Sequence, residues 1–477
     1  MSIIHQGLKL GVSCCALAGA VAYRGGAAEQ PRPNVLLILA DDLGWPDVSC
    51  NGRPPWQTPN IDQLAREGMR FTAAYAASPV CSPTRASLLT GKYPQRLGMT
   101  GILEMVGKQY KVPENAEVMS PATDGKLPPG EVSVASALRE GGYATCIVGK
   151  WHVGGHAKDY GFDAWPMFTP GNGQKRFIDG EFFTEKQTEA AIQWMGEKRR
   201  QPFFLYFSTH AVHNPFAASK TYIDENLARG LPAKGPWNAT YAGFVRHVDD
   251  AVGRLLTALD ALNLAQDTMV IFYSDNGGRG LDISRNDPFR GAKGNLYEGG
   301  IREPLIIRWP GRIKAGTTCD TPVTSTDFYP TLLECAGLPL RPAQHRDGIS
   351  FLPLLEGASH LERDTLYWHI PHYSTVAVPS SAIRSGDWKL IEYYSDYRRD
   401  WDDAKQIVTE RHTSARVELY NLRSDPYEAK DVANQQAAIA AELKRKLDDH
   451  LKAVGARLPP ANPAYDPKKP ETGLFAM

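Results

Sequence analysis

Short apolar runs alternate with helical patterns along most of the chain. Continuous apolar runs at residues 35–40, 144–148, 203–207 and 269–273 are typical of parallel strands that are buried on both faces of a sheet. Between them, residues 132–139 and 241–262 have helical spacing, and the first of these stretches ends before Gly141 and Gly142. The alternation predicts an α/β fold with a large, mostly parallel sheet flanked by helices.

The pattern changes after residue 360. Short strands are predicted at 366–370, 381–384, 388–393 and 417–420, followed by a helix over 434–454 and an extended, proline-rich tail. We therefore expect a large α/β domain at residues 31–360 and a smaller α+β subdomain with an antiparallel sheet at 361–477.

The first 28 residues are typical of an export signal. Lys9 precedes a stretch of apolar and small residues at 11–22, which is too short to span a bilayer. We expect a signal peptide at 1–28 and a periplasmic or secreted protein, with a cytosolic tail as the alternative. A lipid anchor at Cys14 or Cys15 is less favoured, because Gly11 stands where a lipobox has a larger aliphatic residue. No later apolar segment is long enough to predict a transmembrane helix.

The charge and cysteine content of the chain limit which binding partners are expected. The 53 Lys and Arg residues balance 53 Asp and Glu residues, so no global charge attracts nucleic acid, and no nucleic-acid partner is expected. Five of the seven cysteines follow the export signal, and their spacing does not predict a zinc site. Cys319 and Cys335 could form a disulfide or remain free thiols, and the state of Cys50 and Cys146 is equally open.

Oxygen ligands follow two of the apolar runs directly. The first run leads into Asp41 and Asp42, and the fourth leads into Asp275 and Asn276. Ligands of open α/β sheets bind at the carboxyl ends of the strands, where these residues are expected to meet. Such a set suits Ca²⁺ or Mg²⁺, although the Asp pair alone could also be a solvated turn.

Basic residues follow the other two runs and one glycine-rich turn. Lys150 and His152 come after the second run, His213 after the third, and Arg290 and Lys293 lie in a turn with glycines. Each could be an ordinary surface side chain, but their shared position at strand ends and in a close-approach turn indicates an anion site.

Cys81 begins a predicted short helix. Pro83 fits the first helical turn and Gly91 fits the stop, so Cys81 would face unpaired N–H groups that favour an anion. A cysteine-dependent phosphatase has arginine six residues after the cysteine, where this chain has Ser87. A structural thiol is the remaining alternative.

Cys81, Pro83 and Arg85 also have the spacing of the modification signature of type I sulfatases. With further family-like segments at 88–94, 149–152 and 295–300, the chain resembles the formylglycine-dependent sulfatases of the alkaline-phosphatase-like superfamily. The resemblance covers about residues 33–355 and implies that 31–360 is a sulfatase catalytic domain.

The resemblance implies a role for each candidate residue. Asp41, Asp42, Asp275 and Asn276 would bind a metal, usually Ca²⁺ in this family and less often Mg²⁺. A maturation enzyme would oxidise Cys81 to a formylglycine, whose oxygen also reaches the metal. Its hydrate would attack sulfur, leaving a sulfated intermediate.

The basic residues would act on the hydrate and on the sulfate. Arg85 and Lys150 would hold the hydrate, while Lys150, His213 and Lys293 would bind sulfate oxygens. His213 or Lys293 would protonate the leaving oxygen, and His152 would remove a hydrate proton so that sulfate is expelled.

A sulfated carbohydrate is the expected substrate. Segments 366–373 and 381–390 resemble exported bacterial carbohydrate sulfatases, some of which act on 4-O-sulfated galactose or N-acetylgalactosamine. His369 and His372 are expected to bind the sugar at the mouth of the site, unless they are packing residues, and Arg290 is expected to bind substrate.

Two other functions remain as alternatives. Phosphonate and phosphodiester hydrolases of the same superfamily have His directly after the second metal-binding Asp, where this chain has Asn276. A non-catalytic sulfoglycan-binding protein would be expected to have lost Cys81 or a metal ligand, and none is lost.

Overall fold

A computed structural model gives the fold of the chain. It describes residues 32–469 except 53, 109–111, 167–176, 179–180, 281–282, 374–377, 403–406 and 414–415. Residues Arg32–Met477 form one compact unit. The expected signal peptide, with Cys14 and Cys15, lies outside the described residues. No helix in the described part of the chain has the length and apolar composition needed to cross a membrane.

The main sheet has eight strands in the order β10-β2-β8-β7-β1-β6-β3, with β9 beside β2. Its strands are β1 (Asn34–Ala40), β2 (Met69–Tyr75), β3 (Ala144–Gly149), β6 (Phe203–Ser208), β7 (Thr268–Ser274), β8 (Arg302–Arg308), β9 (Thr317–Cys319) and β10 (Val323–Thr324). The four predicted apolar runs form the adjacent parallel strands β7, β1, β6 and β3. Strand β8, which was not predicted, is antiparallel to both β2 and β7.

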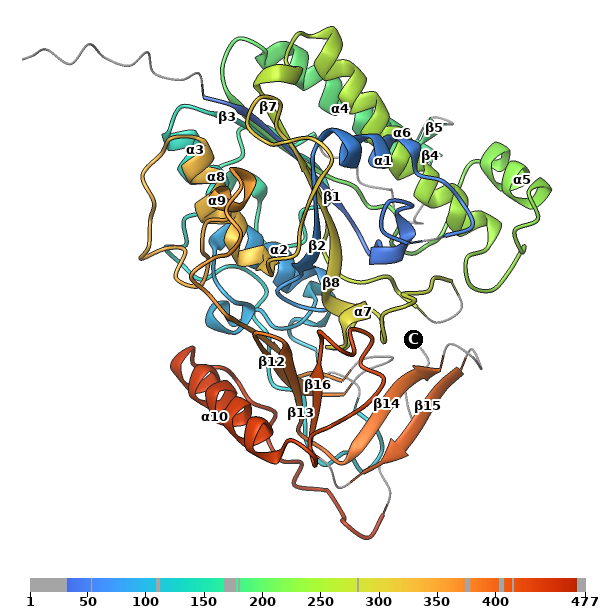
Figure 1. Cartoon of the computed structure of the whole chain (residues 1–477), viewed down its shortest axis with the longest axis vertical. Coiled ribbons are helices and arrows are strands. Elements are labelled where there is room, and N and C mark those ends of the chain that lie inside the picture. Colours follow the sequence, from blue (N-terminus) through green and yellow to red (C-terminus); the bar gives the residue numbers. More distant parts are fainter. Residues whose placement is uncertain are drawn as a thin grey trace, which may run out of the picture. The chain divides into compact units, whose positions relative to one another are not determined.

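Alternate residues of β1 face two different apolar cores. Leu37 and Leu39 face one core, and Leu36 and Ile38 face the other. Helices α2 (Cys81–Thr90), α3 (Val134–Glu140), α8 (Phe328–Cys335) and α9 (Leu352–Leu355) cover the first face, and α1 (Pro59–Glu67), α4 (Phe183–Lys198) and α6 (Ala239–Ala261) cover the second (Figure 1). Burial on both faces explains why the strands are apolar throughout, and the predicted α/β fold is confirmed.

Short elements complete the part of the chain before the C-terminal sheet. They are η1 (Trp45–Asp47), η2 (Pro94–Leu97), η3 (Leu103–Met105), η4 (Ala157–Tyr160), η5 (Ala265–Asp267), η6 (Ser325–Asp327), β4 (Phe177–Ile178), β5 (Glu181–Phe182), α5 (Lys220–Ala228) and α7 (Glu298–Ile301). The five described cysteines are all free, so Cys319 and Cys335 form no disulfide with each other.

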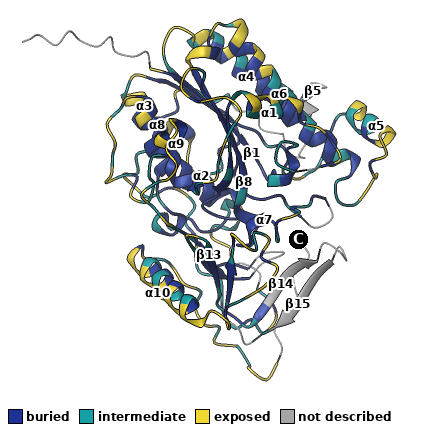
Figure 2. Ribbon diagram, in the orientation of Figure 1, coloured by how far each residue is buried: buried dark blue, intermediate teal, exposed yellow. Residues whose placement is uncertain are grey.

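A separate antiparallel sheet forms the C-terminal part, as predicted. It contains β11 (Thr365–Ile370), β12 (Ser380–Ser385), β13 (Trp388–Tyr393) and β16 (Val417–Asn421), and β14 (Tyr397–Asp402) pairs with β15 (Ile407–His412). Helix α10 (Ala437–Ala453) packs Leu443 and Leu447 on one face of the four-stranded sheet and exposes its outer side (Figure 2). The boundary near residue 360 stays a prediction.

Buried charges join this sheet to α7. Lys389 Nζ on β13 lies 2.9 Å from Glu298 Oε1 and 2.8 Å from Glu428 Oε1, and all three side chains are 0% exposed. The Glu298 N–H also donates to Glu428 Oε2 at 2.6 Å. Burial would raise the pKa of Glu298, but Lys389 and Arg302 outweigh burial and lower it to about 2. Burial raises the pKa of Glu428 to about 7 despite Lys389, so the shared lysine compensates Glu298 fully and Glu428 in part.

Replacing Lys389 with Met is expected to lower the free energy of unfolding by about 3–5 kcal/mol, because two buried carboxylates would lose their shared partner. Urea denaturation followed by circular dichroism measures the change. The control is Lys446→Met, which removes an exposed pair with Glu442 and should cost roughly 0–1 kcal/mol. Equal, small losses in both variants would contradict the assignment.

Candidate active site

The carboxyl ends of β1 and β7 bring four oxygen-bearing side chains together. The two strands are parallel neighbours with Ala40 opposite Ser274, so Asp41 and Asp42 emerge beside Asp275 and Asn276. The Asp42 N–H donates to Asp275 Oδ1 at 3.2 Å, and Asn276 Nδ2 donates to Asp42 Oδ1 at 2.8 Å. All four residues are buried. The predicted cluster of oxygen ligands is therefore present as one contiguous group.

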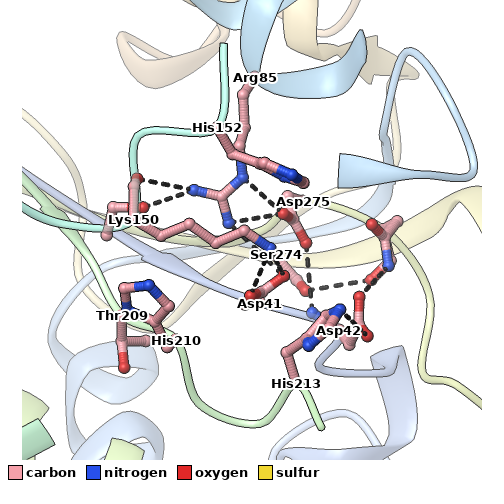
Figure 3. Close-up of polar contacts among 12 residues, drawn as sticks. Asp41, Asp42, Arg85, Lys150, His152, Thr209, His210, His213, Ser274 and Asp275 are labelled. Atoms are coloured by element: carbon pink, nitrogen blue, oxygen red, sulfur yellow. Dashed lines mark hydrogen bonds and ion pairs between the residues drawn. The ribbon is translucent and has the colours of Figure 1, made fainter. Parts of the chain in front are cut away.

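Two lysines compensate two of these carboxylates. Lys150 Nζ lies 2.7 and 2.9 Å from the two Asp41 oxygens (Figure 3), and Lys293 Nζ lies 2.6 and 2.7 Å from those of Asp42. Burial tends to raise the pKa of Asp41, but Lys150 and other nearby cations hold it well below its ordinary value. Both carboxyl groups are thus anionic, and the lysine chains reach the same edge of the sheet.

Arg85 is enclosed beside the same cluster. Its Nε donates to Asp275 Oδ2 at 2.8 Å, and one terminal nitrogen donates to the Lys150 carbonyl at 3.2 Å and to Ser208 Oγ (Figure 3). The side chain is 0% exposed. Arg85 therefore fixes helix α2 to the ends of three strands, a contact that the sequence did not predict.

Cys81 is the first residue of α2 and its side chain faces the cations. Burial tends to raise the pKa of its thiol, but Lys150, His152 and Lys293 outweigh burial and lower that pKa to about 6. The helix ends at Gly91, whose φ of 69° is the left-handed conformation that the predicted stop requires. Position 81 is thus an environment that stabilises an anionic side chain.

His152 lies between Cys81 and an unpredicted carboxylate. Its Nε2 is 2.9 and 3.1 Å from the two oxygens of Glu104, and its Nδ1 is 3.2 Å from Ser82 Oγ. Burial lowers the pKa of His152, but Cys81 and its hydrogen-bond partners raise it overall. Glu104 belongs to no motif that could have identified it in the sequence.

His213 is near the opposite carboxylate. Its Nε2 lies 3.8 Å from Asp42 Oδ2, and its Nδ1 lies 2.7 Å from the Asn214 carbonyl oxygen. Burial lowers its pKa, although Asp42 and Asp41 act in the other direction. The structure therefore gathers six predicted catalytic residues around one cluster: Cys81, Arg85, Lys150, His152, His213 and Lys293.

The structure corrects the expectation for His369 and His372. Each is only 2% exposed. His369 is bonded to Ser381 Oγ at 2.7 Å and to the Arg457 carbonyl at 3.2 Å, and His372 Nε2 lies 2.9 Å from Thr100 Oγ1. Burial lowers the pKa of His369 to about 4 and that of His372 to about 3. These are interior packing residues and not sugar-binding groups at a mouth.

Arg290 makes several contacts within the protein, and its expected role in substrate binding stays a prediction. Its guanidinium lies 3.9 Å from the centre of the Tyr297 ring and donates to the Tyr420 hydroxyl at 3.0 Å and to the Glu428 carbonyl at 3.3 Å. These contacts fasten the turn that carries Lys293 to the C-terminal part of the chain. Arg290 is therefore a structural link.

The residues present fit a hard divalent cation. One ligand atom from each of Asp41, Cys81 and Asp275 lies within 4.8 Å of the others. Asn276 Oδ1 is buried and accepts no hydrogen bond within the described part of the chain. Carboxylate and amide oxygens are the ligands that Ca²⁺ and Mg²⁺ prefer.

Comparison with known proteins identifies the family. Residues 33–338 match the sulfatase family model, and residues 292–454 match the model for the C-terminal region of N-sulphoglucosamine sulphohydrolase. The chain belongs to the sulfatase family and is a sulfuric ester hydrolase. Human arylsulfatase A is 31% identical over 90% of this chain and 88% of its own length. N-acetylgalactosamine-6-sulfatase of Mus musculus is 32% identical over 86% of this chain and 83% of its own.

Solved structures share the fold. The crystal structure of Ps i-CgsB has a TM-score of 0.71 and 28% identity, covering 88% of this chain and 92% of that one. Its complex with k-i-k-neocarrahexaose has a TM-score of 0.70 at the same identity and coverage. The phosphonate monoester hydrolase of Agrobacterium radiobacter has a TM-score of 0.63, 23% identity and coverage of 89% and 96%, which shows a common fold alone.

The variant Asn276→Ala is expected to weaken Ca²⁺ binding about 10- to 100-fold, because it removes a buried oxygen that has no other partner. Isothermal titration calorimetry on metal-free protein measures the dissociation constant. Asn434→Ala, which changes an exposed asparagine, is the control and should bind like the wild type. Equal affinity in all three proteins would place the metal elsewhere.

Proposed function

We propose that this sulfatase hydrolyses O-sulfate monoesters of carbohydrates, using a formylglycine made from Cys81 and a bound divalent cation, Ca²⁺ rather than Mg²⁺. One observation carries the proposal. The side chain at position 81 stands at a helix start where Lys150, His152 and Lys293 favour an anion, and Asp41 and Asp275 offer oxygens beside it. Nucleophile, metal ligands and anion-binding groups thus converge at one point.

The metal and the modified residue each supply one kind of chemistry. Ca²⁺, held by Asp41, Asp42, Asp275 and Asn276, would act as a Lewis acid toward the sulfate group. Formylglycine would supply a hydroxyl nucleophile in its hydrated form, in place of the Cys81 thiol. The formal charges of the three carboxylates and of Arg85, Lys150 and Lys293 cancel, so a bound divalent ion leaves positive charge for an anionic ester.

Lysines and the arginine position and stabilise the reacting groups. Lys150 pairs with Asp41 and Lys293 pairs with the adjacent Asp42, so their ammonium groups are suited to bind sulfate oxygens as charge develops on them. Arg85 holds Asp275 and the start of α2 in place, which keeps residue 81 in line with the ester. This enclosed arrangement needs little reorganisation during the reaction.

Two proton transfers are required. His152 takes a proton from the hydroxyl at residue 81, because its ring lies directly beside that side chain. The leaving oxygen receives a proton from His213 or from Lys293. Burial disfavours the protonated form of His213, whereas Asp42 and Cys81 raise the pKa of Lys293 despite its burial. Both residues remain candidates for this acid.

The relatives support a sulfated sugar as the substrate class. One curated relative is named for N-acetylgalactosamine 6-sulfate, and one structural neighbour is complexed with k-i-k-neocarrahexaose. We propose sulfated galactose or N-acetylgalactosamine, with the 4-O and 6-O esters as the pair to compare. Export through residues 1–28 and conversion of Cys81 by a formylglycine-generating enzyme belong to the same proposal.

The replacement Cys81→Ala is expected to lower sulfate release by about 10³-fold or more, because it removes the nucleophile and leaves the anion site in place. Sulfate release from 4-O- and 6-O-sulfated N-acetylgalactosamine measures turnover, and a melting curve confirms the fold. Cys50→Ala is the control and should retain activity.

A phosphonate monoester and a phosphodiester are assayed alongside. The account predicts slower turnover of both than of the sulfated sugars. Full sulfate release by Cys81→Ala, or a preference for the phosphorus esters, would contradict the proposed function.

A further inference from the structure

A carboxylate outside the family-like motifs contacts His152. Glu104 lies in η3, 48 residues before His152, and its oxygens are 2.9 and 3.1 Å from His152 Nε2. The η3 segment is fastened to the signature itself, because the Leu103 N–H donates to Ser82 Oγ at 3.2 Å. The same hydroxyl lies 3.2 Å from His152 Nδ1. Glu104, His152 and Ser82 therefore form one connected group beside residue 81.

The chemistry of these partners fixes the tautomer of the ring. A hydrogen bond from His152 is the largest influence on Glu104 and lowers its pKa to about 2, so the carboxylate is ionised. An ionised carboxylate only accepts hydrogen bonds, so Nε2 must carry the proton. In the neutral ring Nδ1 is then the acceptor. A side-chain hydrogen bond joins His152 to Cys81, and because Nε2 faces Glu104, Nδ1 is the nitrogen that can take a proton from residue 81.

The backbone conformation of His152 explains why its ring needs the contact with Glu104. Its φ of 57° is in the left-handed region, which costs energy for a residue with a side chain. The residue follows the end of β3 and lies outside any helix or strand, so no regular element fixes the ring. The contacts with Glu104 and Ser82 provide that restraint from a different part of the chain.

We propose that Glu104 is a positioning residue, which accepts a hydrogen bond from His152 Nε2–H and thereby aims Nδ1 at the residue-81 hydroxyl that loses its proton when sulfate leaves. The inference rests on the proposed function, in which His152 acts as the base. In that step His152 Nδ1 takes the proton of a residue-81 hydroxyl. The O–H electron pair forms the carbonyl bond, the bond between the residue-81 carbon and the sulfate ester oxygen breaks, and sulfate leaves with the electron pair of that carbon–oxygen bond. Glu104 stays a carboxylate throughout.

The solvent exposure of the Glu104 side chain indicates how it acts on His152. Its side chain is 62% exposed, so solvent screens its charge, and orientation is the larger contribution. A neutral acceptor of the same length should then serve almost as well. Glu104→Gln is expected to keep kcat within about threefold of the wild type. Glu104→Ala is expected to lower kcat about 10- to 100-fold and to lower KM with it, so that kcat/KM stays near the wild-type value, because only the step after sugar release is slowed.

The first test needs no formylglycine and no turnover. In a Cys81→Ala background, nitrogen NMR of labelled histidines at a pH where the ring is neutral reports the tautomer of His152, which is assigned by the signal lost in His152→Ala. The Nε2–H tautomer should dominate with Glu104 and with Glu104→Gln, and a mixture should form with Glu104→Ala. An unchanged tautomer in Glu104→Ala would overturn the inference.

The second test uses the matured enzyme. Glu104→Ala should release the desulfated sugar at the wild-type rate in the first turnover and then turn over slowly, because only sulfate expulsion uses His152 as base. Glu114→Ala, which changes an exposed glutamate, is the matched control and should behave as wild type. His152→Ala separates the two failures. If His152→Ala is inactive while Glu104→Ala is fully active, only the positioning role of Glu104 is contradicted. If His152→Ala is itself fully active, both the positioning role and the proposed function are contradicted.

Discussion

Compensation of buried charge at the carboxyl edge of the main sheet is the constraint on which the site depends. Asp41, Asp42 and Asp275 are excluded from water, and each has a cation within 2.9 Å. Removing a single member would leave a buried charge without its partner, which is far more costly than losing a surface pair. The positive and negative side chains of the site therefore compensate one another in the folded protein. Binding of a divalent cation or an anionic ester then changes the net charge of the site.

Backbone bonds of the Lys293 turn and one side chain of the C-terminal part of the chain support this unit. Gly294 N–H donates to the Pro79 carbonyl at 2.9 Å, and Lys293 N–H donates to the Gly278 carbonyl at 3.0 Å, so the Lys293 turn touches two strand-end segments. Trp368 on β11 donates to the Ala76 carbonyl at 2.8 Å, five residues before Cys81. The geometry of the nucleophile segment and of the Lys293 turn thus depends on a sheet that contributes no predicted catalytic group.

Much of the fold was predictable because strands that are buried on both faces form continuous apolar runs in the sequence. The runs that became β1, β3, β6 and β7 are apolar at every position, and parallel neighbours must end at one edge, which also placed Asp41 beside Asp275. Strand β8 was not predicted because it begins with the charged residues Arg302 and Glu303, which interrupt the apolar pattern. Its antiparallel direction depends on the order of strands in the sheet, which the sequence pattern does not show. Sequence similarity suggested the residue type at His369 but could not show its burial. The role of Glu104 depends on a loop that meets His152 across 48 residues, a distance that no local pattern spans.

The central claim is that residue 81 of the active protein is a formylglycine held in an anion-stabilising site. Mass spectrometry of the peptide containing Cys81, from protein that releases sulfate from a sulfated sugar, tests it most directly. Residue 81 is expected to have the mass of formylglycine and to be trapped by a hydrazide, in proportion to specific activity. Full activity in protein whose residue 81 is entirely an unmodified thiol would contradict it.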